Sequence, residues 1–449
     1  MEIDPKECFP ITHVQKRIWH TEKIYPGTST WTIAFAVKYN HMLDINLLED
    51  ALNLALQKND GLRLQMTENS ENGLTVVKQY LVDFQPIRLP YFDFSTGGKE
   101  ALTEWLDKEV QEPFELIDHS LYYFAAVRFN QNENGYFMKL HHIIFDGWSL
   151  FMLINEIDQI YKQLEQGLKP DATPNNTYLN YIRDEKAYLE SEQFQKDRAF
   201  WLDNMLPLPA QAELFLSSYQ SDNILAKRNL LPIEGALRNE IDAFFQQNNT
   251  TIFKIFMAAL AVYIARVTGN RDVVIGMVNH NRGLPEHKKM IGMFVSTIPL
   301  RIQADDSLTF YELLEQIGQN MNYIIKNHGK YPFDLLAADL REATGIDPGY
   351  LLNIILDGHP DLEQSDFNLD LLLPKHDTNP MIIHIDPGSM NMNGRLEVEW
   401  GYQSARFSDE YIENMQQGMV DILRGVLSNP GEKIARIECH LQTKFCIQK

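Results

Sequence analysis

The sequence has few cysteines and no basic cluster. Its three cysteines, Cys8, Cys439 and Cys446, are odd in number and widely spaced, so they define neither a disulfide framework nor a zinc site. Glutamate, histidine and cysteine do not cluster at metal-ligand spacings, and we expect no bound metal or redox cofactor. Acidic residues outnumber basic ones by 61 to 40, which argues against nucleic-acid and anionic-membrane partners. This composition favours a reducing, cytoplasmic compartment.

Long apolar runs are also absent. The most apolar stretch, 252–267, contains Lys254 and Arg266 and is too short to cross a bilayer, so we expect a buried core helix there. The chain opens with the acidic, polar sequence MEID, which does not resemble a signal peptide. With 449 residues, the chain exceeds the usual size of a single hydrophobic core, and two lobes are predicted.

Helix and strand patterns are mixed along the whole chain, which predicts an α/β fold. Strands are predicted at 33–39, 74–82, 121–129, 136–140, 273–278, 296–302, 351–356, 381–385 and 396–402. Helices are predicted at 47–57, 99–110, 148–166, 194–206, 238–247, 252–267 and 310–327. Proline, glycine and asparagine concentrate in 166–177, so we predict an N-terminal lobe of residues 1–175 and a C-terminal lobe of residues 176–449.

The heptad HHIIFDG at 141–147 is the most informative stretch of the chain. A predicted hairpin with Asn134-Gly135 as its two-residue turn leads into the heptad, and an amphipathic helix that ends at Gly167 follows it. A histidine at such a strand-to-helix turn can reach into a cleft while the sheet fixes its position. Two structural interpretations stay open. Asp146 can simply cap the helix, and the two histidines can be ordinary core residues.

The heptad and five other segments resemble motifs of the condensation domains of nonribosomal peptide synthetases. HHIIFDG matches the family's HHxxxDG signature. The other segments, all in the family's order, are THVQKRIW at 12–19, KNDGLRL at 58–64, IGMFVSTIPLR at 291–301, HGKYPFD at 328–334 and DTNP at 377–380. The resemblance covers nearly the whole chain.

This resemblance implies two lobes, each like one chloramphenicol acetyltransferase protomer, in a V-shaped pseudo-dimer with the heptad at the centre of a tunnel. In the family the second histidine is the functional one and the first is largely structural. We therefore expect His142 to accept a proton or orient the amine, with His141 in support. Asp146 is expected to pair with an arginine, for which Arg63 is the candidate, unless it only caps the helix. Gly147 has no β-carbon and allows a substrate arm to pass close to the backbone.

Three features favour the starter subclass of surfactin-type lipopeptide synthetases, which joins a fatty acyl group to an amino acid. The chain begins with its own methionine shortly before the first motif, with no carrier domain upstream. Segments 17–29 and 58–64 resemble starter sequences. Ser296 stands where elongating domains carry asparagine. The alternative is an internal domain for which Met1 is only a boundary.

The expected reaction is N-acylation of an aminoacyl thioester by a fatty acyl group, in particular a 3-hydroxyacyl group, from acyl-CoA. The substrates are carried on coenzyme A and on the 4'-phosphopantetheine of a peptidyl carrier protein, so no bound cofactor is expected. A downstream adenylation domain and a monomeric state are expected as well. Two other functions stay open, an elongating condensation domain with a carrier-bound donor and a catalytically silent recruitment module.

Candidate substrate-binding residues are the aromatic side chains near the first motif and the heptad, with two polar residues from later motifs. They are Trp19, Tyr25, Trp31, Phe145, Trp148, Ser296 and Asn379. An apolar cleft with few polar groups suits an acyl chain. The same aromatic residues are also compatible with positions in the hydrophobic core, and this interpretation stays open.

Overall fold

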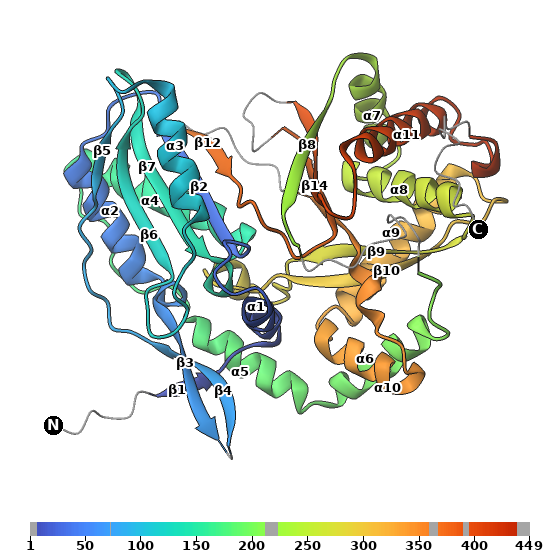
Figure 1. Cartoon of the computed structure of the whole chain (residues 1–449), viewed down its shortest axis with the longest axis horizontal. Coiled ribbons are helices and arrows are strands. Elements are labelled where there is room, and N and C mark those ends of the chain that lie inside the picture. Colours follow the sequence, from blue (N-terminus) through green and yellow to red (C-terminus); the bar gives the residue numbers. More distant parts are fainter. Residues whose placement is uncertain (1–6, 72, 212–222, 359–366, 389–394, 438–449) are drawn as a thin grey trace. The chain divides into compact units, whose positions relative to one another are not determined.

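The structure, a computed structural model, describes residues 7–71, 73–211, 223–358, 367–388 and 395–437 (Figure 1). It divides into two compact units, neither of which is continuous in sequence. Unit 1 comprises Met1–Phe194, His280–Val295 and Gln364–Lys375, and unit 2 comprises Gln195–Asn279, Ser296–Glu363 and His376–Lys449. Both units combine helices with a β-sheet, so the predicted α/β class is confirmed.

Unit 1 contains a five-stranded sheet in the order β12-β2-β7-β6-β5 and a three-stranded sheet in the order β1-β4-β3. The first sheet consists of β2 (Thr32–Tyr39), β5 (Tyr91–Asp93), β6 (Tyr122–Arg128), β7 (Asn134–His141) and β12 (Phe367–Leu372), and the second of β1 (Cys8–Pro10), β3 (Leu64–Glu71) and β4 (Leu74–Leu81). The helices are α1 (His13–Ile24), α2 (Ile45–Lys58), α3 (Gly98–Gln111), α4 (Gly147–Glu165) and α5 (Tyr178–Leu189), with 3-10 turns η1 (Asp60–Arg63), η2 (His142–Ile144) and η3 (His287–Lys289).

Helices cover both faces of the five-stranded sheet (Figure 1). Helix α3 packs on one face, where Leu106 and Val110 join the alanine-rich inner side of β2. Helices α2 and α4 pack against each other on the opposite face. Strand β7 lies between β2 and β6 and is buried along its whole length. Because β7 is held on both edges and both faces, the position of its last residue, His141, is well determined.

The turn between β6 and β7 differs from the prediction. Asn134 and Gly135 are the first residues of β7, and the loop is formed by 129–133 instead. The buried Asn134 side chain accepts the N–H of Leu43 at 2.7 Å and donates to its carbonyl oxygen at 3.0 Å. A β-carbon on Gly135 would lie 2.0 Å from the carbonyl oxygen of Val37, so glycine is required by close packing rather than by a turn.

The division between the units also differs from the predicted boundary at residue 175. The segment 166–177 is a loop, but its end is fastened to η1. Asp60 accepts the backbone N–H of Tyr178 at 2.9 Å and the hydroxyl of Thr177. These bonds keep α5 in unit 1, and the units divide after Phe194. The motif KNDGLRL therefore serves to anchor the segment that the composition suggested as a linker.

Unit 2 contains a six-stranded sheet in the order β10-β9-β11-β13-β14-β8, in which β11 runs parallel to β9 and β13 and the other neighbours are antiparallel. Its strands are β8 (Ala226–Ile233), β9 (Asp272–Asn279), β10 (Ser296–Gln303), β11 (Ile354–Gly358), β13 (Met381–Asp386) and β14 (Leu396–Gln403). Its helices are α6 (Glu192–Met205, which begins in unit 1), α7 (Gly235–Gln247), α8 (Ile252–Thr268), α9 (Phe310–Asn327), α10 (Phe333–Thr344) and α11 (Asp409–Ser428), with η4 (Pro348–Leu352) and η5 (Ile434–Arg436).

Helix α8 is the central helix of unit 2. Every residue from Ile255 to Ala265 is buried, and the helix contacts α9, α11 and β9, which confirms the predicted core helix. Among the described residues, no single helix has the length and hydropathy to span a membrane. Helices α7 and α8 pass that test only as a pair, bent by 111°.

One strand of unit 1 comes from the part of the chain that otherwise builds unit 2. Strand β12 follows β11 and precedes β13 in sequence, yet it pairs antiparallel with β2, with Leu369 opposite Val37. The segment 280–295 also belongs to unit 1. The chain therefore leaves unit 2 twice to complete unit 1.

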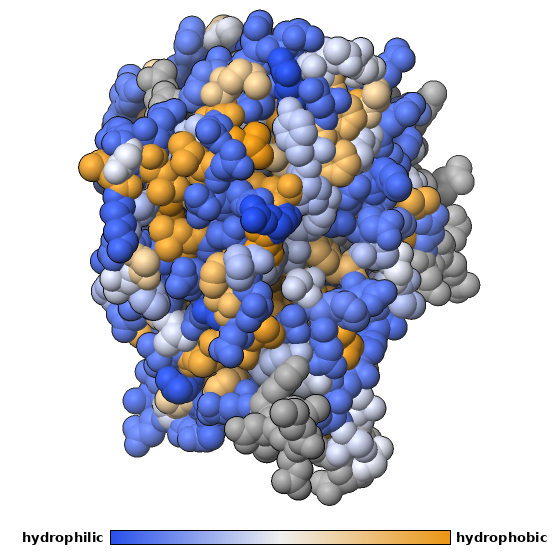
Figure 2. Space-filling view, turned by 90° about the vertical axis from the view of Figure 1, so that its left-hand side faces the viewer, coloured by the Kyte–Doolittle hydropathy of each residue, from blue (hydrophilic) through white to orange (hydrophobic). Residues whose placement is uncertain are grey.

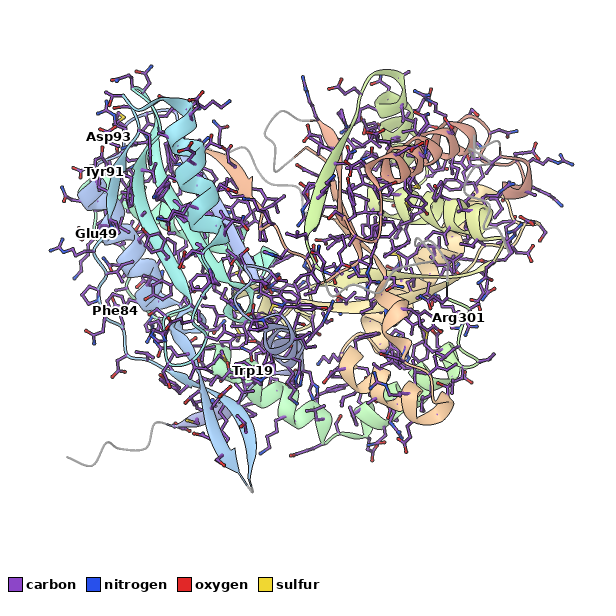
Figure 3. The ribbon with its side chains drawn as sticks, viewed as in Figure 1. Trp19, Glu49, Phe84, Tyr91, Asp93 and Arg301 are labelled. Atoms are coloured by element: carbon purple, nitrogen blue, oxygen red, sulfur yellow. The ribbon has the colours of Figure 1, made fainter. Side chains whose placement is uncertain are left out.

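The segment 82–90 runs along the side of unit 1 without regular secondary structure. Side chains of α2 hold it there. Asn53 makes hydrogen bonds of 2.7 and 2.9 Å with the N–H and carbonyl of Ile87, and Glu49 accepts the N–H of Leu89 at 2.8 Å. Figure 3 labels Glu49 on this side, together with the half-exposed Tyr91. Apolar patches alternate with polar side chains on the face shown in Figure 2.

Replacing Gly61 with alanine tests the packing of η1 against the segment 280–295. A β-carbon on Gly61 would lie 2.1 Å from the carbonyl oxygen of Ile291. One backbone must move, and we expect Gly61→Ala to lower the free energy of unfolding by about 1–3 kcal/mol, measured from urea midpoints. Gly97→Ala is the matched control, because the nearest atom to its new β-carbon is 3.7 Å away. Equal midpoints for the two variants would contradict this packing.

Candidate active site

The heptad forms the predicted strand-to-helix turn. Strand β7 ends at His141, η2 begins at His142 and α4 begins at Gly147. The N–H of His142 donates to the carbonyl of Trp31 at 2.7 Å, and the carbonyl of His142 accepts the N–H of Phe145 at 3.3 Å. Both backbone polar groups of His142 are thus satisfied, and the backbone that carries the ring is fixed.

The imidazole of His142 is half-buried, and its two nitrogens differ in access. Its Nδ1 is closed off from solvent and has no hydrogen-bond partner among the described residues. The indole of Trp31 lies edge-on to the ring, with the two centroids 5.7 Å apart. Burial lowers the pKa of His142, and the Asp146 carboxylate opposes this effect only in part. The ring is therefore neutral at pH 7, and Nε2 is the nitrogen left to accept a proton.

His141 uses both of its ring nitrogens inside unit 1. Its Nδ1 accepts the backbone N–H of Ile143 at 3.1 Å, and its Nε2 lies 3.3 Å from a carboxylate oxygen of Glu22. The ring of Phe114 meets it edge-on at 5.9 Å. With both nitrogens occupied and only 3% of its surface exposed, His141 supports the turn, while the neighbouring ring of His142 is open.

Asp146 is fully buried at the first turn of α4 and does more than cap the helix. It accepts the N–H of Ser149 at 2.8 Å, which is the expected cap. Arg282 donates to both carboxylate oxygens, at 2.9 and 3.0 Å, and Phe294 donates its backbone N–H at 3.0 Å. The prediction of a buried arginine partner is thus correct in kind, and the cap is present as well.

The identity of that partner was predicted wrongly. Arg63 donates to the backbone carbonyls of Leu56 and Val82, at 3.3 and 2.6 Å, so its guanidinium closes the end of η1 and does not reach Asp146. The true partner, Arg282, lies 136 residues from Asp146 in sequence. No local pattern marks Arg282, because its role depends on a segment that lies within the predicted C-terminal lobe.

Arg282 ties the segment 280–295 to the start of α4. Its Nη1 donates to the carbonyls of His287 and Met290, both at 2.6 Å, and its guanidinium lies 3.9 Å from the ring centroid of Phe294. Ser149 adds a second connection, since its hydroxyl donates to the carbonyl of Gly292 and accepts the N–H of the same residue, at 2.9 and 3.0 Å. The helix that follows His142 is thereby held at its first turn.

A protein-family model described as the condensation domain matches residues 6–444. The chain belongs to the condensation-domain family of nonribosomal peptide synthetases. Condensation domains catalyse amide-bond formation by acyl transfer and use no bound cofactor, and they work with carrier proteins.

Two curated relatives belong to lipopeptide synthetases of Bacillus subtilis (strain 168). This condensation domain is 29% identical to one component of plipastatin synthase over 438 residues, and 30% identical to one component of surfactin synthase over 434 residues. The matches cover 96% and 95% of this chain but only 17% and 12% of the relatives. The chain thus spans less than a fifth of the relatives' length.

Solved structures of condensation domains share the fold. A variant of the starter condensation domain of rhizomide synthetase, in complex with C8-CoA, matches with a TM-score of 0.79 at 20% identity, over 96% of this chain and 97% of that one. The first condensation domain of the CDA synthetase matches with a TM-score of 0.82 at 18% identity, over 97% and 99%. These likenesses confirm the predicted condensation-domain fold, related to that of chloramphenicol acetyltransferase.

The predicted aromatic residues of this condensation domain have different surroundings. Phe145 is completely buried and belongs to the core, so its prediction as a substrate-binding residue is wrong. Trp19 lies on α1, where Figure 3 labels it, and is 7% exposed. Tyr25, at the end of α1, and Trp148 are half-exposed. Among the predicted aromatic residues, Trp31 is the one whose ring lies against His142.

The first turn of α4 leaves space beside the site. Gly147 is exposed, and a β-carbon added there would meet no atom within 4 Å. Next to it, the indole Nε1 of Trp148 donates to the carbonyl of Lys288 at 3.3 Å. The space beside Gly147 is compatible with the predicted passage of a substrate arm, which stays a prediction.

The two polar candidates, Ser296 and Asn379, belong to unit 2. Ser296 is the first residue of β10, opposite Asn279, whose Nδ2 lies 3.5 Å from the serine hydroxyl. Asn379 donates its backbone N–H and its Nδ2 to one carboxylate oxygen of Asp377, at 2.8 and 3.1 Å. Their contact with substrate stays a prediction.

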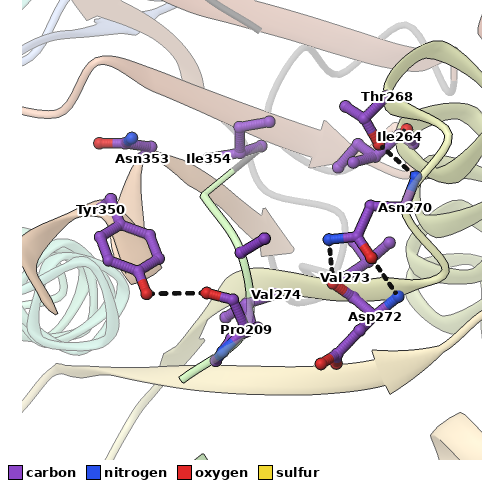
Figure 4. Close-up of a pocket in the computed structure, with 11 residues that line it drawn as sticks. Pro209, Ile264, Thr268, Asn270, Asp272, Val273, Val274, Tyr350, Asn353 and Ile354 are labelled. Atoms are coloured by element: carbon purple, nitrogen blue, oxygen red, sulfur yellow. Dashed lines mark hydrogen bonds between the residues drawn. The ribbon is translucent and has the colours of Figure 1, made fainter. Parts of the chain in front are cut away.

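Unit 2 also contains an internal cavity of about 20 Å³, lined by apolar residues and by Asn270, Asp272 and Tyr350 (Figure 4). The Tyr350 hydroxyl donates to the carbonyl of Pro209 at 2.8 Å on its wall. A cavity of this size holds about one water molecule and is far too small for an acyl chain. Within the described ranges, no three histidine, cysteine or acidic side chains form a group that could hold a metal ion.

Replacing Asp146 with alanine separates the ion pair from the helix cap. Removing one partner of a buried pair leaves the charge of Arg282 uncompensated, so we expect unfolding free energy to fall by about 3–5 kcal/mol. Asp44→Ala is the matched control. Asp44 is an exposed N-cap of α2 whose side chain accepts the N–H groups of Asn46 and Leu47, and its loss should cost about 1 kcal/mol. Similar losses for the two variants, measured from denaturant midpoints, would refute a stabilising role of the pair.

Proposed function

We propose that this condensation domain is a starter domain that transfers a fatty acyl group, in particular a 3-hydroxyacyl group, from acyl-CoA to a carrier-bound aminoacyl thioester. The observation that carries the proposal is the neutral imidazole of His142, held at the end of β7 with Nε2 accessible. Its similarity to two lipopeptide synthetases and its fold likeness to a starter domain bound to C8-CoA support a fatty acyl donor.

In the proposed reaction, the amine nitrogen attacks the carbonyl carbon of the acyl thioester, and a C–N bond forms. His142 accepts the proton that the nitrogen loses. The C–S bond then breaks, and the proton passes to the sulfur, so coenzyme A leaves as its thiol. An α-amino group with a pKa of about 7.7–8.0 needs only a weak base, which suits a neutral histidine. The positive end of the α4 dipole stabilises the negative charge on the carbonyl oxygen.

The proposal includes a peptidyl carrier protein as the partner that presents the acceptor, a downstream adenylation domain, a monomeric state and a cytoplasmic location. An elongating domain with a carrier-bound donor is the second candidate, because the first condensation domain of the CDA synthetase matches the fold as well as the starter domain does. A silent recruitment module is disfavoured by the intact pair of His141 and His142.

Replacing His142 with alanine tests the catalytic role. We expect acyl transfer to fall by about 10²-fold or more, the usual contribution of a positioned acid–base group, while the thermal midpoint stays close to that of the native protein. The exposed His119 provides the control, and His119→Ala should transfer acyl groups at the native rate. Near-native turnover in His142→Ala would remove this residue from the mechanism.

A series of acyl-CoA donors of increasing length tests the starter assignment. Each buried methylene contributes about 0.8 kcal/mol, so kcat/KM should rise several-fold per carbon until the acyl pocket is full. Mass spectrometry of the aminoacyl carrier protein measures the product. Rates that stay flat from acetyl to dodecanoyl, or product formed only from a carrier-bound peptidyl donor, would favour the elongating function instead.

A further inference from the structure

Glu22 lies in the last turn of α1 and contacts the first histidine of the heptad. Its carboxylate oxygen Oε1 is 3.3 Å from Nε2 of His141. The two side chains are 12% and 4% exposed, so the contact is largely shielded from solvent. No sequence pattern marks Glu22 as part of the site, because 119 residues separate it from His141.

The hydrogen bonds of His141 define its tautomer. Because Nδ1 accepts the backbone N–H of Ile143, that nitrogen must carry a lone pair rather than a proton. The ring proton therefore sits on Nε2 and is donated to Glu22. A carboxylate at this position stabilises the one tautomer that leaves Nδ1 free to hold Ile143.

The peptide groups on both sides of Ile143 are held by side chains from the same region. His141 holds its N–H, and Nε2 of Gln15, also on α1, donates to its carbonyl at 2.9 Å. Gln15 is itself fully buried and bonded to Gln79 at 3.0 Å. Ile143 directly follows His142, so these two contacts restrict the backbone from which the catalytic ring projects.

We propose that Glu22 is a positioning residue for acyl transfer, which acts on His142 through His141 and the backbone of Ile143. Glu22 does not touch the substrate in this proposal, which rests on the proposed function of His142. Loss of the carboxylate frees His141 to adopt the other tautomer, in which Nδ1 carries the proton and repels the N–H of Ile143. The turn then loses one of its two holds, and the ring of His142 moves from its position.

Four variants test this chain of contacts. In Glu22→Ala, kcat should fall by about 10–100-fold, the range for a small misplacement of a catalytic group, while KM changes by less than about twofold. Glu22→Gln retains an oxygen that can accept the Nε2 proton, and it should be at least about fivefold more active than Glu22→Ala. The double variant with His141→Ala should be no slower than His141→Ala alone, because both act through one path. His20→Ala, an exposed residue of the same helix, should match the native protein.

Nitrogen NMR of the histidine rings provides a readout that does not depend on turnover. In the native protein, His141 should carry its proton on Nε2, and in Glu22→Ala it should show a mixture of tautomers. An unchanged tautomer in Glu22→Ala, a kcat within about twofold of native, or losses that multiply in the double variant would overturn the proposal. If His142→Ala retained turnover, the proposed function would fail, while the NMR result would still report on the contact of Glu22 with His141.

Discussion

The buried ion pair between Asp146 and Arg282 is the constraint on which unit 1 depends. Both groups are withdrawn from water, which is costly unless their hydrogen bonds are satisfied. Asp146 meets this requirement with Arg282 and two backbone N–H groups, and Arg282 reaches two carbonyls of the segment 280–295. One interaction therefore fixes a helix start, a distant segment and, four residues before the aspartate, the turn that carries His142.

Features that depend on near neighbours could be predicted from the sequence. The amphipathic pattern at 310–327 coincides with α9, where Thr309 and Glu312 form a capping box. Features set by distant contacts could not. Asn134 reads as a turn residue, but its side chain serves Leu43, which lies 91 residues away. The loop 166–177 reads as a linker, yet bonds from η1 join its end to unit 1.

The same distinction holds within the candidate site. His141, His142 and Asp146 fall within one heptad, so the local pattern brings them together correctly. Their supports come from elsewhere in the chain. Arg282 has no sequence signal that connects it to Asp146. Arg63 was the natural candidate because it lies in a recognisable motif, but nearby carbonyls take up its donors before it can reach the interior.

The return of the chain to unit 1 has a consequence for synthesis on the ribosome. Asp146 emerges 136 residues before Arg282, a delay of roughly 7–27 s at about 5–20 residues per second. During that interval the carboxylate has no cation to meet it, and the edge of the sheet beside β2 waits still longer for β12. Unit 1 therefore cannot complete its fold before most of unit 2 has been made. For the same reason, no single cut in the gene separates the two units, and exchanging one of them between synthetases requires at least three matched segments.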